Sequence, residues 1–295
     1  MGIKIYVDAA SNLFPELIRK RGLDITVVNM HLFVEDKEYN CYDDDIDIKK
    51  FSKSFYTDLK EGKSVRTSLI NPDEYFNYFK KDIDNGHQII CFTMAKGISG
   101  TYQSACIARD MIKDETGKDD IYVVDSATAG FGEGRQAIHA ARWVKKGKSF
   151  EEVIKEAEEY KWKVRSEFFV DNVKYLVKTG RVSSIVARIA NVLRIKVLLY
   201  GSYESKIEMT GKVAGRNLAI KKLAKQCIEH IVDADKQIVY ISHCDCYDDA
   251  FELASILKKN GVTNVEIHPY DVITGSHIGP GSLAMFYVGK DRYLK

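Results

Sequence analysis

An alternation of short apolar runs with amphipathic stretches is the feature that most constrains the fold of this chain. Apolar runs occupy residues 3–8, 24–34, 88–94 and 121–125, and stretches with apolar residues at helical spacing lie between them. Strands that alternate with helices in this way form an open, largely parallel sheet with helices on both faces. The sequence therefore predicts an α/β domain over residues 1–160.

Local signals predict where several of the helices begin. The Asn-Pro pair at residues 71–72 is a cap followed by Pro at the first helical position, and residues 149–152 form a capping box. Ser11 and Asn12 are expected to cap an earlier helix that ends at Gly22.

In the second half of the chain, strands and helices no longer alternate regularly. Two runs at residues 195–200 and 206–209 are joined through Gly201, which predicts an antiparallel hairpin. A helix is expected over residues 217–231. We therefore expect a mixed or antiparallel α+β domain over residues 161–295, whose C-terminal loop and strand can return to the first domain.

The composition excludes several classes of protein. With 44 Lys and Arg against 42 Asp and Glu, the formal net charge of +2 is too small to indicate a nucleic-acid or anionic-membrane partner. No apolar run approaches the roughly 18 residues of a transmembrane helix, and the first residues are typical of a strand, not of a signal peptide. We expect a cytoplasmic protein whose six cysteines are reduced.

The strongest local signal for a binding site lies at residues 91–104. There a strand ends, a loop with Gly97 and Gly100 turns, and a helix begins beside Ser99. The free amides at the N-terminus of a helix form an anion site, to which Ser99 adds a hydroxyl. Ser99 can equally serve only as a helix cap. The spacing fits neither a Walker P-loop nor a nucleophile elbow.

Two further segments present groups that can bind an anion. Thr67 and Ser68 offer hydroxyls before the cap at residues 71–72, and residues 274–281 form a Gly-rich loop around His277. Three glycines and one proline give this loop an unusual backbone path. A histidine held in such a loop is more often functional than a histidine on an ordinary surface.

Asp8 and Asp125 each end an apolar strand of the first domain. In open α/β sheets, ligands lie beyond the carboxyl ends of the strands. Each carboxylate can hold a loop of the site by accepting hydrogen bonds, or serve as a purely structural anchor.

Two clusters resemble metal sites without meeting their requirements. The His-Cys-Asp-Cys run at residues 243–246 lacks a second pair of ligands, and the aspartates at residues 43–47 are typical of a solvated helix start. We expect no metal and no cofactor.

A helix over residues 183–195 has an unusually wide apolar face. Arg188, Asn191 and Arg194 share about a third of the helical wheel, and apolar residues fill the rest. Such a face is buried against more than one neighbour, either in ordinary core packing or beside an apolar cavity between domains.

Six segments in chain order resemble the motifs of the DegV family of bacterial fatty-acid-binding proteins, and the resemblance runs over essentially the whole chain. These segments are VDAAS at residues 7–11, RTS at 66–68, GISGTYQS at 97–104, VDSAT at 124–128, YLVKTGRVS at 175–183 and GSHIGPG at 275–281. Each motif is weak alone, but their common order is specific.

The resemblance implies two α/β domains with a fatty acid in a tunnel between them. Fatty acid kinase B subunits of this family present the acyl carboxylate to a separate kinase, which makes an acyl phosphate for phospholipid synthesis. No residue is then catalytic. The positions that match the family's carboxylate site are Thr67, Ser99, Gly100 and His277. Supporting positions are Asp8, Ser68, Asp125, Ser126, Gly275 and Gly279, and the expected acyl-chain lining is Ile98, Ile185 and Ile189.

The chain departs from the family motifs at three positions. Ala9 stands where Ser is usual, Leu69 replaces the Gln of Thr-Ser-Gln-Pro, and Ala214 occupies a commonly basic position. The last departure bears on the kinase partner more than on lipid binding.

Two other functions stay open at the level of sequence. In a serine-dependent acyl hydrolase, Ser99 would be the nucleophile and His277 the base, with Asp8 or Asp125 orienting the histidine. A phosphometabolite-binding protein would need several cations near the Ser99 loop, where the sequence offers mainly Lys96 and Arg66.

Overall fold

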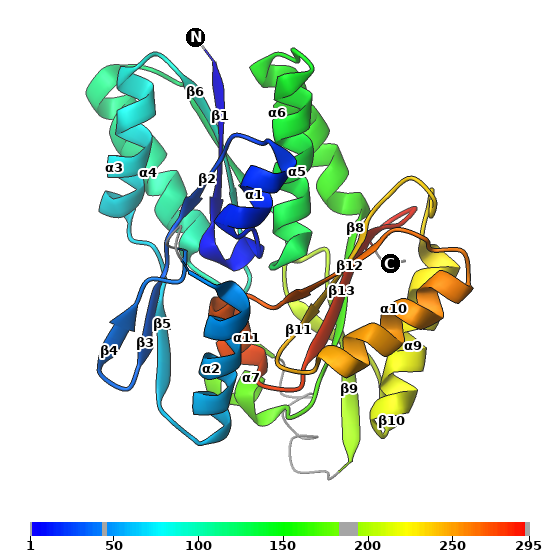
Figure 1. Cartoon of the computed structure of the whole chain (residues 1–295). Helices are drawn as coiled ribbons and strands as arrows, with labels where there is room; N and C mark the ends of the chain where they lie inside the picture. Colours follow the sequence, from blue (N-terminus) through cyan, green and yellow to red (C-terminus); the bar gives the residue numbers. More distant parts are fainter. Residues whose placement is uncertain (1, 43–45, 183–193, 293–295) are drawn as a thin grey trace. The chain divides into compact units, whose positions relative to one another are not determined.

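The computed structural model describes residues 2–42, 46–182 and 194–292 (Figure 1). The chain divides into two units. Unit 1 comprises Met1–Ile46 and Arg66–Lys161, and unit 2 comprises Asp47–Val65 and Trp162–Lys295.

A parallel four-stranded sheet forms the centre of unit 1. Its strands are β1 (Ile3–Asp8), β2 (Ile25–Val28), β6 (Gln88–Thr93) and β7 (Ile121–Asp125), in the order β2-β1-β6-β7. Every neighbouring pair is parallel. The α/β class and the parallel sheet predicted from the sequence are confirmed.

Helices cover both faces of this sheet. α3 (Pro72–Asp84) and α4 (Thr101–Thr116) pack together on one face, and α5 (Phe131–Lys145) and α6 (Phe150–Tyr160) lie on the other (Figure 1). Both predicted caps are present as capping boxes, in which the side chain at the cap accepts from the third amide of the helix.

The helix expected after Ser11 and Asn12 begins later than predicted. Residues Ala9–Ser11 form a short 3-10 turn (η1) capped by Asp8, and Asn12 ends it in the left-handed region with φ 60°. α1 (Pro15–Arg21) then starts with Pro15 at its first position. The sequence signal was misleading because Ser and Asn also favour tight turns.

Residues 24–34 form two strands, not one. After β2, the chain crosses to β3 (His31–Val34), which belongs to a second sheet of order β4-β3-β5 with β4 (Lys37–Tyr39) and β5 (Val65–Ser68). The crossing falls at Asn29 and Met30, and apolar residues stand on both sides of it, so hydropathy alone did not mark the change of sheet.

Unit 2 contains a mixed six-stranded sheet of order β10-β9-β8-β13-β11-β12. Its strands are β8 (Val164–Val170), β9 (Ile195–Gly201), β10 (Ile207–Ala214), β11 (Val239–His243), β12 (Val265–Pro269) and β13 (Leu283–Val288). Only the β11–β12 pair is parallel among the pairs described. The predicted hairpin is the antiparallel pair β9–β10, so the mixed second fold is confirmed.

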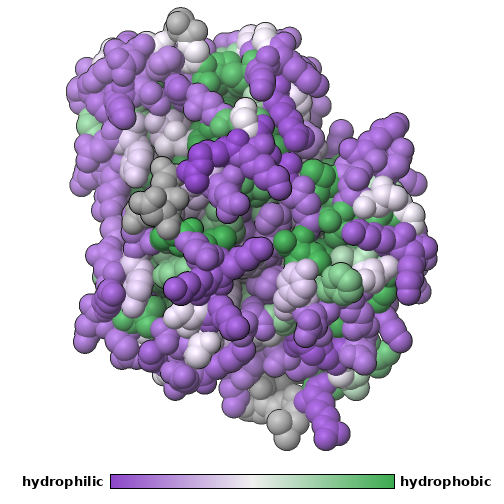
Figure 2. All heavy atoms as spheres, viewed as in Figure 1, coloured by the Kyte–Doolittle hydropathy of each residue, from purple (hydrophilic) through white to green (hydrophobic). Residues whose placement is uncertain are grey.

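Two long helices cover one part of this sheet. α9 (Arg216–His230) and α10 (Tyr247–Lys259) pack against each other, and Leu223 and Leu253 are fully buried in the core that they share with the sheet. Burying a leucine side chain of this size contributes about 1.5–3 kcal/mol. Figure 2 shows apolar side chains at the surface over α10, where Tyr247 and Phe251 are more than half exposed.

Three further helices of unit 2 pack around the segment that contains His277. α11 (Val272–Ile278) contacts both α7 (Lys174–Thr179) and α2 (Ile48–Lys60) (Figure 1). α7 ends at Gly180, whose φ of 71° is typical of a glycine that ends a helix.

Within the described residues, no helix has the length and the apolar character needed to cross a membrane.

Candidate functional site

The loop between β6 and α4 carries the first group of predicted site residues. Ser99 lies just before α4, and its Oγ accepts a hydrogen bond from the Thr101 amide at 3.2 Å. The same Oγ lies 2.8 Å from the Thr101 hydroxyl. Ile98 and Ser99 are half-buried, and Gly100 is exposed. Ser99 therefore precedes the N-cap, Gly100, and its hydroxyl closes the turn that leads into the 16-residue helix α4.

Two carboxylates from the flanking strands hold this loop through its backbone. Asp8, at the end of β1, accepts from the Met94 amide at 2.8 Å and from the Ala10 amide at 2.8 Å. Asp125, at the end of β7, accepts from the Lys96 amide at 3.2 Å. Both residues thus act as anchors of the loop that leads to Ser99.

Burial changes the electrostatics of one anchor. Asp8 is fully buried, and this burial raises the pKa of its carboxyl to about 6, while the two amide donors act in the opposite direction. The Asp8 amide in turn donates to Glu133 at 3.2 Å.

Close to Asp125, the Ser126 hydroxyl donates to the Thr128 carbonyl at 3.2 Å and closes the turn after β7.

The Thr67 segment approaches the Ser99 loop within unit 1. A Cβ placed on Gly100 would lie 3.0 Å from Leu69 Cδ2, so Leu69 contacts the N-terminus of α4. Thr67 is half-buried, and Ser68 is exposed with its hydroxyl donating to the Leu69 carbonyl at 3.3 Å. The structure thus brings together two of the predicted segments, with Leu69 at the junction.

His277 lies in a short helix and not in the predicted loop. Asp271 accepts from the Thr274 amide at 2.6 Å and so caps α11, which carries His277 in its last turn. Gly279, with φ 80°, ends the helix. The three glycines of this segment suggested a loop, but Gly275 stands inside the helix.

The surroundings of His277 favour its neutral form. Burial lowers the pKa of the imidazole to about 4, and the positive charge of Arg181 adds to this effect. A neutral imidazole has one N–H donor and one acceptor. His277 can therefore donate a hydrogen bond to an anion near neutral pH.

Contacts with two tyrosine rings explain why glycine stands on both sides of His277. A Cβ on Gly275 would lie 1.9 Å from the Tyr56 hydroxyl, and a Cβ on Gly279 would lie 2.3 Å from Cδ2 of Tyr175. Only Gly279 also has a positive φ. The glycines therefore provide room for aromatic rings, whereas the sequence analysis had attributed them to backbone path alone.

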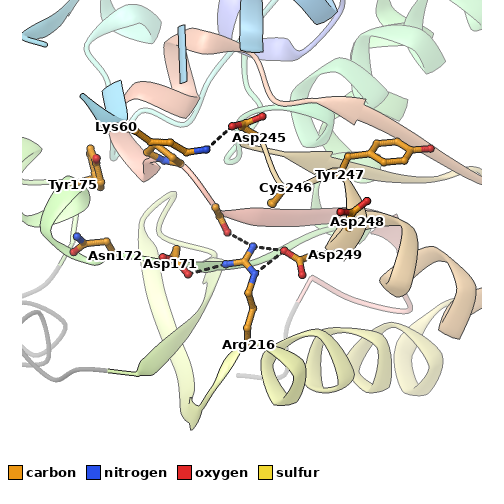
Figure 3. A pocket seen from close by; sticks show the side chains of 12 residues that line it. Lys60, Asp171, Asn172, Tyr175, Arg216, Asp245, Cys246, Tyr247, Asp248 and Asp249 are labelled. Atoms are coloured by element: carbon orange, nitrogen blue, oxygen red, sulfur yellow. Dashed lines mark hydrogen bonds and ion pairs between the residues drawn. The ribbon is translucent and has the colours of Figure 1, made fainter. Parts of the chain in front are cut away.

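A polar pocket of about 710 Å³ lies in unit 2 beside the end of this segment (Figure 3). Arg216 is at its centre, where Nη1 donates to Asp171 at 2.7 Å, Nε to Asp249 at 2.6 Å and Nη2 to the Gly281 carbonyl at 2.6 Å. At one side of the pocket, Lys60 forms an ion pair with Asp245.

Sequence reasoning did not identify this pocket. Several of its lining residues, among them Tyr175, Arg216, Pro280 and Gly281, lie in or beside segments singled out by their motifs. Their separation along the chain gives no sign that they meet. Arg216 donates to the Gly281 carbonyl as well as to two carboxylates, so the guanidinium holds the chain after His277 in place.

The remaining predicted residues stand as follows. Thr67, Ser99 and Gly100 belong to unit 1 and His277 to unit 2, so their assembly into one carboxylate site stays a prediction. Ile185 and Ile189 lie outside the described residues.

Among the residues that are described, no three His, Cys, Asp or Glu side chains form a group that could hold a metal ion. In the run at 243–246, the Cys246 amide donates to His243 Nδ1 at 3.3 Å.

Comparison with known proteins places these observations in a family. Residues 2–290 match the family described as "Uncharacterised protein, DegV family". A DegV domain-containing protein from Clostridium perfringens is 32% identical over 286 residues, which cover 97% of both chains. The match confirms the family that the six motifs predicted.

Solved structures share the fold over nearly the whole chain. A DegV family protein from Ruminococcus gnavus, refined with vaccenic acid, is 25% identical, with a TM-score of 0.83 over 96% of this chain and 99% of that chain. The fatty acid kinase B3 protein of Streptococcus pneumoniae, loaded with linoleic acid, is 21% identical, with a TM-score of 0.81 over 98% of this chain and 100% of that chain. These structures confirm the two-domain fold predicted from the sequence.

Proposed function

The chain belongs to the DegV family, and from this premise we propose that it binds a long-chain fatty acid and holds the acid by its carboxylate. One observation carries the proposal: the relative from Ruminococcus gnavus, which shares the fold over 96% of this chain, holds vaccenic acid. The Ser99 loop and α11 supply this chain with donors suited to a carboxylate.

The energetics of such a site are favourable. Burying an acyl chain gains about 0.8 kcal/mol per methylene, or on the order of 10 kcal/mol for a long chain before the entropic cost of binding. An unpaired carboxylate would lose several kcal/mol on burial. Donors of the protein must therefore replace its water.

We assign the donors to four residues. The hydroxyls of Thr67 and Ser99 and the backbone at Gly100 bind the carboxylate at the N-terminus of α4, where the helix dipole also favours an anion. The neutral imidazole of His277 donates a further hydrogen bond. Ile98, Ile185 and Ile189 are proposed to line the acyl chain.

We further propose that the bound carboxylate is presented to a separate kinase, which phosphorylates it. The shared fold with the fatty acid kinase B3 protein of Streptococcus pneumoniae supports this step. Ala214 is the departure that bears on it, because this last residue of β10 occupies a position that is commonly basic in the family. All six cysteines are free thiols, which supports a cytoplasmic location.

A carrier explains the geometry of Ser99 better than a hydrolase does. Its Oγ accepts from the Thr101 amide and lies against the Thr101 hydroxyl, an arrangement that closes the turn into α4. Asp8 and Asp125 hold backbone amides of the loop and are committed to that task. We therefore propose that no residue of this chain is catalytic.

Native mass spectrometry with lipid extraction tests the proposal. The purified protein should carry a fatty acid in a roughly one-to-one ratio, or take up added oleate or palmitate after delipidation. Extraction without any acyl chain, together with no uptake, would contradict fatty-acid binding. Hydrolysis of acyl esters that is abolished by Ser99→Ala would replace the carrier with an enzyme.

A further inference from the structure

The helix that carries His277 is held at two points by aromatic rings from other helices of unit 2. α11 has only seven residues, Val272–Ile278, and a helix of this length has little stability of its own. Its position must therefore come from contacts with its neighbours, which are α7 and α2.

Tyr175 supplies the contact at the C-terminal end of α11. A Cβ on Gly279 would lie 2.3, 2.6 and 2.7 Å from three atoms of the Tyr175 ring. The ring thus lies directly on the backbone two residues after His277. Since Gly279 also has a φ of 80°, both its conformation and its space exclude a larger residue.

Tyr56 supplies the contact at the other end. It is fully buried on α2, and its hydroxyl donates to the Tyr270 carbonyl at 3.3 Å. A Cβ on Gly275 would lie 1.9 Å from this hydroxyl and 2.8 Å from Cζ. The ring of Tyr56 therefore touches the backbone two residues before His277.

We propose that Tyr175, together with Tyr56, is a positioning residue that sets the place of the His277 imidazole by fixing α11 at Gly275 and Gly279. The role of His277 as a donor to the ligand rests on the proposed function, whereas the packing of the two tyrosines on α11 does not. The ring carries the effect and not the hydroxyl of Tyr175, because ring atoms make the contact with Gly279.

The first measurement follows His277 itself and needs no ligand. NMR titration of the histidine, assigned with His277→Gln, should give a pKa of about 4 in the wild type and in Tyr175→Phe. Tyr175→Leu should raise the pKa of His277 toward its ordinary value, because α11 loses the contact at Gly279 that fixes it and the imidazole becomes less buried. Tyr56→Leu should raise the pKa of His277 in the same way. Tyr56→Phe tests the hydroxyl separately, because this hydroxyl is the Tyr56 atom nearest to Gly275 and donates to the Tyr270 carbonyl.

Tyr247→Leu is the matched control. Tyr247 belongs to the same unit and is 56% exposed on α10. Its loss should leave the pKa of His277 at the wild-type value. Thermal melting identifies the folded variants, and Tyr175→Met serves if Tyr175→Leu does not fold.

The second measurement compares a fatty acid with its methyl ester. Tyr175→Leu should lower affinity for the acid about tenfold more than affinity for the ester, and Tyr175→Phe should change the ratio little, since only the acid needs the His277 donor. An unchanged pKa of His277 with an unchanged ratio in Tyr175→Leu would overturn the proposal. If the wild type binds neither ligand, the proposed function fails, and the titration still decides the role of Tyr175.

Discussion

The Ser99 loop of unit 1 and α11 of unit 2 are both Gly-containing segments that carry a predicted carboxylate-binding side chain, but they are held by different physics. Buried carboxylates of Asp8 and Asp125 hold the Ser99 loop through backbone amides. Aromatic rings that lie on glycine backbones hold α11. The first arrangement depends on charge and pH, and the second on shape. Substitutions can therefore separate the two.

The largest effect is expected where the buried charge is removed. Asp8→Ala leaves the amides of Met94 and Ala10 without their acceptor in a buried place, and unsatisfied buried donors cost about 1–3 kcal/mol each. We expect a loss of about 4 kcal/mol in the free energy of unfolding, measured by urea denaturation. Ser68→Ala, at an exposed hydroxyl, should change it by less than about 0.5 kcal/mol.

The pH dependence of the unfolding free energy tests the role of the Asp8 carboxyl independently. Its folded pKa of about 6 lies above the unfolded value of about 3.9, so the proton stabilises the folded state. This contribution is full below pH 4 and is lost as the pH rises through 6. Asp8→Asn should flatten the dependence between pH 4 and 6. An equal slope in the variant and the wild type would assign the titration to another group.

The second effect tests the ring contacts of α11. Gly279→Ala forces a methyl group into the Tyr175 ring and a left-handed φ on alanine, so we expect a loss of about 3 kcal/mol in unfolding free energy. Gly100→Ala in the Ser99 loop is the matched change, with an ordinary φ of −76° and only the flexible end of Leu69 nearby. It should cost less than about 1 kcal/mol.

A double-mutant cycle decides whether the ring causes the loss. Gly279→Ala combined with Tyr175→Leu should cost clearly less than the sum of the two single changes, because the smaller side chain relieves the clash. Additive losses would mean that the backbone conformation of Gly279 accounts for the whole effect.

The third effect concerns the ligand. Ser99→Ala removes a hydroxyl from the proposed carboxylate site, and a hydrogen bond to a charged group is worth about 1.5–3 kcal/mol. Affinity for oleate should fall roughly 30-fold, as calorimetry or fluorescent-ligand displacement can measure. Affinity for methyl oleate should fall much less. Equal losses for both ligands would mean that Ser99 only closes the turn before α4.

The outcome of the sequence analysis differs between the two regions for a physical reason. The strand ends at Asp8 and Asp125, the loop before α4 and the capping boxes at Asn71 and Ser149 were predictable, because short stretches of sequence determine them. The helix at His277 was missed, because the rings that stabilise it come from residues far away in the chain.

The pocket around Arg216 was missed for the same reason. Its ion pairs join residues 171, 216 and 249, which share no local pattern. The family assignment was correct, because six motifs in the right order identify the family without any knowledge of the contacts that their residues make. Gly279 illustrates this, since Gly279 and Tyr175 both lie in motifs and the contact between them was not predicted.

The smallest effect on stability is expected for a surface group of unit 1, the His31 side chain with its two carboxylate partners. His31 on β3 lies 2.5 Å from Glu38 through Nδ1 and 2.6 Å from Glu74 through Nε2, and Glu74 also belongs to the capping box of α3. Glu38 and then Glu74 raise the pKa of His31 through these hydrogen bonds. The protonated imidazole therefore links the β3–β4 hairpin to the start of α3.

The sign of the pH effect follows from this raised pKa. The stabilisation is fully present below the unfolded pKa of about 6.5 and is lost as the pH rises through the higher folded value. Because the His31 side chain is 36% exposed, solvent screening limits the effect to less than about 1 kcal/mol. The melting temperature of the wild type should exceed that of His31→Gln by a few degrees at pH 6 and by less at pH 9. A constant difference would show that His31 acts by packing on Phe33, its stacked neighbour. In unit 1, hydrogen bonds to carboxylates would then stabilise the fold only where they are buried.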